Sequence, residues 1–134
     1  MINLVPDTNI IISSVFWNGN PREVIRKGIL GEYKMITSAE ILDEAANKLR
    51  VKFQFPEESI QELIDTLLTY CYVVEPSSKF DVVRDKKDNK VIECAFDGNA
   101  NYIVTGDPDL LVLEQFKGIK IVTPKQFLDL INKN

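Results

Sequence analysis

The feature that most constrains the fold is the alternation of short apolar runs with longer amphipathic segments along all 134 residues. Strands joined by helices of about 10 to 15 residues form βαβ units, which build parallel sheets with helices on both faces. The sequence therefore predicts a three-layer α/β/α domain with a central sheet of five parallel strands. The expected strands are residues 2–5, 33–37, 71–74, 102–105 and 119–122.

Helix signals fill the intervals between these strands. Pro21, Pro56 and Pro124 stand where a proline opens a helix, and Ser38 and Asp88 stand where an N-cap is expected. A shorter helix is expected after Asp109, extending to the turn at residues 117–118. The predicted helices cover residues 10–17, 21–30, 39–49, 56–70, 88–98, 108–117 and 124 onward.

No internal repeat, low-complexity tract or linker divides the sequence, so we expect one domain over residues 1–134. No segment approaches the run of about 18 apolar residues that spans a bilayer. The first residues lack a basic region and are interrupted by Pro6 and Asp7, which makes a poor signal peptide. We therefore expect a cytoplasmic protein without a membrane partner.

The amino-acid composition limits the catalytic mechanisms and metal sites that the chain could have. The chain has no histidine, which excludes Ser-His-Asp and Cys-His catalysis and every zinc site that needs an imidazole. Cys71 and Cys94 form no C-x-x-C pair, so a structural zinc is also excluded. Hydrolysis would need carboxylates, a metal with oxygen ligands, or a lysine. The net charge of −4 by itself argues against binding nucleic acid through bulk charge.

Acidic residues follow two of the predicted strands. Asp7 comes after the first strand, and Asp107 and Asp109 come after the fourth. Ligands of parallel sheets bind beyond the carboxyl ends of the strands, and the first and fourth strands can be neighbours there. Carboxylates brought together repel, and a hard cation such as Mg²⁺ or Mn²⁺ relieves that repulsion. The alternative is that Asp7 and Asp107 only cap the following helices.

Two further acids have alternative interpretations. Asp88 begins a predicted helix, either as a cap in a solvated charged loop or facing the site with Lys86, Lys87 and Lys90 as phosphate contacts. Glu44 lies off the apolar face of its predicted helix, and its spacing is typical of a surface pair with Lys48.

Five segments in order carry a resemblance that covers nearly the whole chain. They are Asp7-Thr8-Asn9, Trp17-Asn18-Gly19-Asn20-Pro21, residues 38–44 (SAEILDE), residues 85–92 (DKKDNKVI) and residues 101–111 (NYIVTGDPDLL). With these motifs the sequence resembles the PIN-domain family of metal-dependent ribonucleases, most closely the single-domain toxin components of toxin–antitoxin systems. Pro6 departs from the aliphatic residue usual before the first aspartate.

The resemblance implies a site as well as a fold. It places Asp7, Glu44, Asp88 and Asp107 in an acidic Mg²⁺ or Mn²⁺ site, which overrides the surface-pair interpretation of Glu44. Asp109 would be an accessory acid, and Asn9 and Thr105 supporting polar residues. The family also implies a five-stranded parallel sheet, RNA as substrate, homodimers and, for toxin members, a cognate antitoxin protein.

Two other functions fit parts of the sequence. A response-regulator receiver domain shares the length and sheet type, but it needs paired acids after the first strand, where this chain has only Asp7. A PIN fold that binds RNA or protein without cleaving it is the stronger rival, and the presence of all four acids argues against it. Without these four, sixteen acidic residues balance sixteen basic ones, so the excess negative charge coincides with the predicted metal site.

Overall fold

The computed structural model describes residues 1–133 and contains a six-stranded sheet of order β3-β2-β1-β4-β6-β5. The strands are β1 (Asn3–Pro6), β2 (Lys34–Ser38), β3 (Cys71–Val74), β4 (Tyr102–Val104), β5 (Gln115–Phe116) and β6 (Ile119–Val122). The helices are α1 (Thr8–Phe16), α2 (Asn20–Ile29), α3 (Ala39–Val51), α4 (Glu57–Tyr70), a 3₁₀ turn η1 (Lys86–Asp88), α5 (Asn89–Asp97), α6 (Pro108–Leu111) and α7 (Pro124–Asn132).

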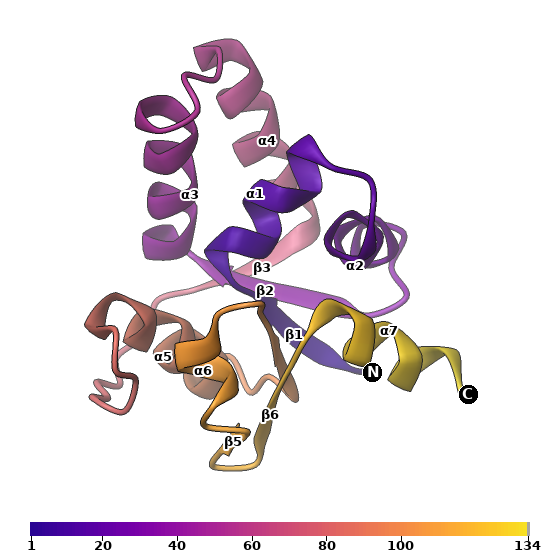
Figure 1. Ribbon diagram of the computed structural model, residues 1–134, viewed down its shortest axis with the longest axis vertical. Coiled ribbons are helices and arrows are strands. Elements are labelled where there is room, and N and C mark those ends of the chain that lie inside the picture. The colour runs from indigo at the N-terminus through magenta and orange to yellow at the C-terminus, as the bar shows by residue number, and fades with distance from the viewer. Residues whose placement is uncertain (134) are drawn as a thin grey trace.

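Helices α1 to α4 lie on one face of the sheet, and α5 and α6 lie on the other, which gives three layers (Figure 1). The predicted parallel sheet is confirmed for β1, β2, β3, β4 and β6. The central strands are almost wholly buried, with Leu4, Val5, Ile103 and Val104 at 0% exposure. Burial on both faces is why these strands have continuous apolar sequences rather than alternating ones.

The sixth strand corrects the prediction of five. Residues 108–117 were expected to form one helix, but α6 ends at Leu111, and β5 pairs antiparallel with β6. The two-residue turn between them, Lys117-Gly118, has φ angles of 47° and 86°. Both central residues of a tight hairpin turn need positive φ, which a glycine adopts without strain. The chain therefore reverses here instead of continuing as a helix.

Pro6 is compatible with its place at the end of β1. The pairing of β1 with β2 ends at Leu4, whereas its pairing with β4 continues to Pro6. Backbone N–H groups alternate in direction along a strand, and the N–H of Asp7 donates to Val104 O at 3.0 Å. The N–H that Pro6 lacks would point toward the side where pairing has already stopped.

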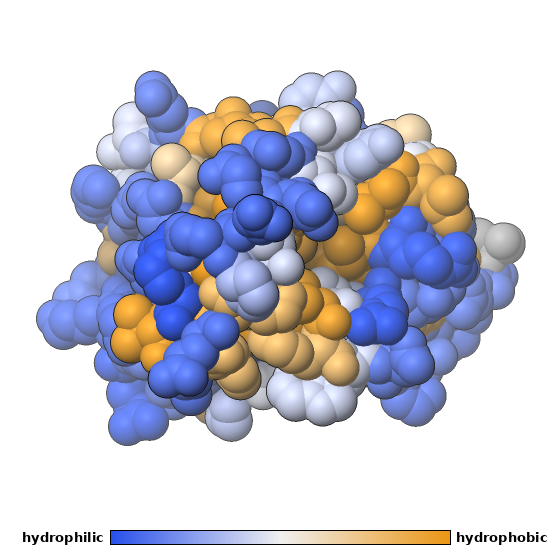
Figure 2. Space-filling model, turned by 90° about the horizontal axis from the view of Figure 1, so that it is seen from above, coloured by the Kyte–Doolittle hydropathy of each residue, from blue (hydrophilic) through white to orange (hydrophobic). Residues whose placement is uncertain are grey.

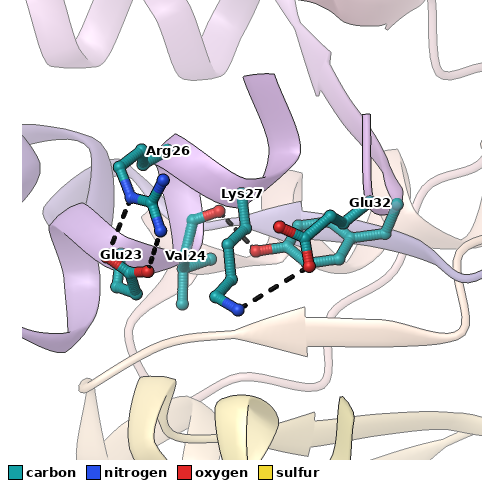
Figure 3. A network of polar contacts seen from close by, with 6 residues as sticks. Glu23, Val24, Arg26, Lys27 and Glu32 are labelled. Carbon is teal, nitrogen blue, oxygen red and sulfur yellow. Dashed lines mark hydrogen bonds and ion pairs between the residues drawn. The ribbon is translucent and has the colours of Figure 1, made fainter. Parts of the chain in front are cut away.

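Polar contacts fix α2 to the turn that precedes β2. Glu23 and Arg26 pair within α2, whereas Lys27 of α2 reaches the turn, with its Nζ 3.6 Å from Glu32 Oε1 (Figure 3). The buried hydroxyl of Tyr33 donates to Val24 O. The Tyr33 ring packs edge-on against Phe127 of α7, with centroids 5.0 Å apart. These contacts therefore hold α2 and α7 near the amino ends of the strands, away from the carboxyl ends that carry the acids.

None of the helices among residues 1–133 is both long enough and apolar enough to cross a bilayer.

Candidate active site

Asp7 and Thr105 lie side by side because the register of β1 and β4 pairs Pro6 with Val104. Asp7 is the N-cap of α1, and its Oδ1 accepts a 2.9 Å hydrogen bond from the N–H of Ile10. Its Oδ2 accepts a hydrogen bond from the hydroxyl of Thr105, which is fully buried. Both roles considered for Asp7, helix cap and site carboxylate, are thus compatible in one side chain.

Thr105 also positions the second strand-end acid. Its Oγ1 accepts the N–H of Asp107 at 2.9 Å, so one buried hydroxyl contacts both Asp7 and the backbone of Asp107. Asp107 is the N-cap of α6, and its Oδ1 accepts the N–H of Asp109 at 2.9 Å. The capping hydrogen bond of α6 therefore fixes Oδ1 of Asp107, while Oδ2 is not used in capping the helix.

Asp88 approaches the same place from the opposite layer. Although it directly precedes α5, its side chain makes no capping hydrogen bond, which corrects the expectation of a cap. The cap of the preceding 3₁₀ turn is Asp85, whose Oδ1 accepts the N–H of Lys87. Oδ2 of Asp88 is buried and has no hydrogen-bond partner among residues 1–133. A buried, unsatisfied oxygen costs free energy unless a ligand satisfies it.

The pKa values of Asp7 and Asp88 are raised because their carboxyl groups are buried close to other acids. Burial raises the pKa of Asp7 to about 6, and the charge of Asp107 adds to the effect, against hydrogen bonds from Thr105 and Ile10 that lower it. Burial raises the pKa of Asp88 to about 7, and neighbouring Asp107, Asp85 and Asp7 raise it further. Like charges close to one another destabilise their ionised forms, which a divalent cation would reverse.

Glu44 has a different environment. Its Oε2 lies 3.0 Å from Nζ of Lys90, and only 17% of the Glu44 side chain is exposed. Burial alone would raise the pKa of Glu44, but nearby Thr8 and Lys90 outweigh it and hold the pKa below its usual range. The surface pair with Lys48 is replaced by this pair across two helices, while Lys48 Nζ lies 3.4 Å from Asn9 Oδ1.

Asp109 belongs to a neighbouring acidic group. Oxygens of Asp85, Asp88 and Asp109 lie within 4.8 Å of one another. Arg84 donates two hydrogen bonds to Asp109, at 2.9 and 3.1 Å, and so neutralises it. Sequence reasoning missed Arg84 and gave Asp85 no role. The only signal in the sequence for Arg84 and Asp85 was their position at the start of the charged segment.

The predicted lysines divide into two kinds. Lys90 is largely buried in its pair with Glu44. Lys86 and Lys87 are exposed, and Lys86 Nζ lies 3.5 Å from Asp81 Oδ2. These two side chains are free to contact a ligand at the rim, whereas Lys90 is committed within the protein.

The donor set fits a hard divalent cation. Every predicted ligand is a carboxylate, and the described residues contain no imidazole to compete. Oδ2 of Asp88 has no hydrogen-bond partner within residues 1–133, and the pKa values of Asp7 and Asp88 are raised, so a cation bound where the three aspartates converge would be stabilised by their negative charge.

A cleft of about 640 Å³ extends from this site along α1. Asn9 and Asp107 lie at its edge, and the starts of α2 and α7 form its far side. It is lined by Asn9, Ile10, Ser13, Asn20, Pro21, Gly106, Asp107, Pro108, Thr123, Pro124 and Lys125. The mixture of amide, hydroxyl and proline surfaces suits a polar chain lying against it.

The fold and site together define a member of the PIN-domain family, to which this chain belongs: the model of the PIN domain matches residues 3–109. PIN domains are generally nucleases, so the chain is of nuclease type. It is similar to the uncharacterized protein MJ1680 of Methanocaldococcus jannaschii, with 32% identity over 148 residues that cover 98% of this chain and 93% of that protein.

Solved structures share the fold at low identity. VapBC2 of Rickettsia felis, solved bound to a promoter DNA fragment, matches with a TM-score of 0.63 and 13% identity over 90% of this chain and 97% of that one. The PIN domain of RRP44 from T. brucei matches with a TM-score of 0.55 and 12% identity over 98% and 82%. FitAcB of Neisseria gonorrhoeae matches with a TM-score of 0.54 and 13% identity over 91% and 98%.

Proposed function

We propose that this chain is an Mg²⁺- or Mn²⁺-dependent ribonuclease that hydrolyses RNA phosphodiester bonds at the carboxyl edge of β1 and β4. The observation that carries the proposal is the convergence of Asp7, Asp88 and Asp107, of which Asp88 has a buried oxygen without a partner among residues 1–133. Three ionised carboxylates held together repel one another, and a bound divalent cation would relieve that repulsion. Membership of a family of nucleases supports the reaction class.

Each residue has a role that follows from its contacts. Asp7, Asp88 and Asp107 would hold the metal, which when bound activates water and stabilises the charge on the phosphate. Thr105 orients Asp7 and fixes the backbone of Asp107. Asn9 borders both the site and the cleft, where its amide can contact the substrate. Glu44, on α3, is the fourth acid of the proposed site and pairs with Lys90.

RNA would lie along the cleft beside α1, with the scissile phosphate over the aspartates. Exposed Lys86 and Lys87 would contact phosphates on the other side of the site. Since the chain has no histidine to deprotonate a 2′-hydroxyl, water is the expected nucleophile. The products would then carry a 5′-phosphate and a 3′-hydroxyl, which end-labelling of the cleaved RNA checks.

We further propose that the chain acts as one nuclease domain in the cytoplasm, as the toxin of a toxin–antitoxin pair and as a homodimer. Its sequence resembles single-domain toxins, and it shares a fold with VapBC2 and FitAcB. Figure 2 shows hydrophobic areas between hydrophilic ones over the helical layer. Val51 of α3 and Leu68 of α4 are exposed, as is Trp17, which follows α1. Sedimentation equilibrium checks the dimer, and growth rescue by a co-expressed neighbouring small protein checks the partner.

The test of the nuclease assignment is cleavage of single-stranded RNA by purified protein with Mn²⁺. Asp7→Asn and Asp107→Asn should each abolish cleavage, because each removes a metal ligand while preserving side-chain volume. Asp43→Asn is the matched control, since Asp43 is an exposed acid next to Glu44 in sequence. Full activity in both site variants would overturn the assignment of these aspartates to the active site.

A further inference from the structure

The ion pair between Glu44 and Lys90 differs from the other ion pairs of residues 1–133. Their side chains are 17% and 18% exposed, whereas every other pair has at least one partner that is 47% exposed or more. The two residues come from α3 and from the first turn of α5. A pair removed from solvent is screened little by salt and holds its geometry, unlike the pairs at the surface.

The ion pair with Lys90 distinguishes Glu44 from the other three predicted acids, Asp7, Asp88 and Asp107. Glu44 has a cation 3.0 Å from its Oε2. Asp7 accepts hydrogen bonds from a hydroxyl and a backbone N–H, and Asp107 accepts one from a backbone N–H and lies against the carboxyl group of Asp88, whose Oδ2 has no partner among the described residues. Among residues 1–133, none of Asp7, Asp88 and Asp107 forms an ion pair, whereas Glu44 forms one with Lys90.

A further lysine borders Glu44 without replacing Lys90. Lys48 follows Glu44 by one turn of α3, and its ammonium contacts the amide oxygen of Asn9 at 3.4 Å. The space around the glutamate is thus occupied by two ammonium groups from two helices. A second divalent ion placed there would be repelled by both.

We propose that Lys90 is a positioning residue whose ammonium takes the place of a second cation at Glu44, so that the site binds one divalent ion, held by the three aspartates. This inference rests on the proposed metal-dependent function. It gives Glu44 the role of anchoring Lys90, and through it the start of α5, next to Asp88. One ion per chain, rather than two, is the measurable consequence.

Isothermal titration of the metal-free protein with Mn²⁺ tests this stoichiometry. The wild type should bind one ion per chain. Lys90→Met should bind two, because Glu44 then faces the site as an unneutralised carboxylate. Lys90→Arg should again bind one. Lys86→Met is the matched control, since it removes a lysine of the same segment whose partner, Asp81, is exposed.

A second variant keeps the test decisive if Lys90→Met folds poorly. Glu44→Gln should still bind one Mn²⁺, with an affinity within about threefold of the wild type, because Glu44 is not a ligand in this scheme. An affinity loss of about tenfold or more, the usual effect of removing a metal ligand or its support, would make Glu44 a ligand and overturn the inference.

The remaining outcomes separate this inference from the proposed function. Two ions bound by the wild type, or one ion bound by folded Lys90→Met, would overturn the role of Lys90 and leave the ribonuclease proposal standing. Wild-type protein that binds no Mn²⁺ at all would overturn both. Binding of one ion together with RNA cleavage, and two ions in Lys90→Met, would support both.

Discussion

Asp7 combines burial, helix capping and negative charge in a single side chain. Only 3% of the residue is exposed, and its two oxygens accept hydrogen bonds from Ile10 and Thr105. These bonds lower its pKa, yet burial outweighs them and the pKa rises to about 6. The metal-free protein therefore carries an acid that is more easily ionised in the unfolded chain than in the folded one.

This imbalance predicts a pH-dependent stability. Between its unfolded pKa of 3.8 and its folded pKa of about 6, Asp7 binds more protons in the folded state, so its contribution to stability is lost as the pH rises through about 6. Asp7→Asn should raise the free energy of unfolding of metal-free protein at pH 7.5 by about 1–3 kcal/mol. Urea denaturation at pH 7.5 and pH 5 measures the effect.

The control for this prediction is Asp43→Asn, whose exposed side chain should leave the stability unchanged at both pH values. Asp7→Asn should gain about half as much at pH 5 as at pH 7.5, because the loss of stability accumulates from the unfolded pKa of 3.8 up to the folded pKa of about 6. An equal gain at both pH values would contradict the role assigned to the charge and favour a packing effect.

Residue spacing was enough to predict the strand-end acids but not their partners. The ends of parallel strands meet at one edge of a sheet, so Asp7 and Asp107 could be placed together from the order of elements, whereas Thr105 was expected there only from the family resemblance. The partner of Glu44 could not be predicted, because both Lys48 and Lys90 are within reach of a long side chain. The choice depends on how α3 and α5 pack, and periodicity within one helix does not contain that information.

At the scale of elements, two glycines allow helices to approach the sheet closely. A Cβ on Gly98, which follows α5, would lie 2.8 Å from Ile36 Cγ2 of β2 and 2.9 Å from the backbone oxygen of Cys94. A Cβ on Gly28 in α2 would lie 2.5 Å from Met35 Sδ. The methionine side chain can move aside, whereas the backbone oxygen at Gly98 cannot.

Gly98→Ala should therefore lower the free energy of unfolding by about 1–3 kcal/mol, the usual cost of overpacking. Gly106→Ala is the matched control, because a Cβ there would meet no atom within 4 Å. Chemical denaturation of both variants provides the comparison. A Gly98→Ala variant as stable as the control would mean that α5 can shift away from β2 at negligible cost.

The sequence predicted most helices and parallel strands because each has its own periodic pattern and cap. It failed for β5, a strand of two residues, which is too short to have a pattern. The turn Lys117-Gly118 was the available signal, and it was interpreted as the end of a helix. The prediction therefore failed because β5 is too short, not because of the types of residue in it.

At the scale of the whole molecule, the metal is expected to stabilise the fold. Mn²⁺ that binds only the folded state at about 100 times its dissociation constant adds about 2.7 kcal/mol to the free energy of unfolding. Because ligands bind the metal in their ionised form, this gain should increase as the pH rises through about 7, the pKa of Asp88. Thermal melts with and without Mn²⁺ at pH 6 and pH 8 measure it.

The matched variant for this prediction is Asp88→Asn, which should lose most of the Mn²⁺-dependent gain at both pH values. Asp81→Asn, an exposed acid close to Asp88 in sequence, should keep it. A gain that does not depend on pH, or one that survives in Asp88→Asn, would place the metal elsewhere on the protein.

The contact between Asp7 and Thr105 joins residues 98 positions apart in the chain. During synthesis, Asp7 leaves the ribosome before its partner Thr105 and Asp107, which emerge only after four of the five parallel strands have been made. A nascent chain interrupted before that point cannot assemble the cluster of aspartates. The proposed ribonuclease would thus stay inactive toward the transcript and ribosome that are producing it until translation has passed Asp107.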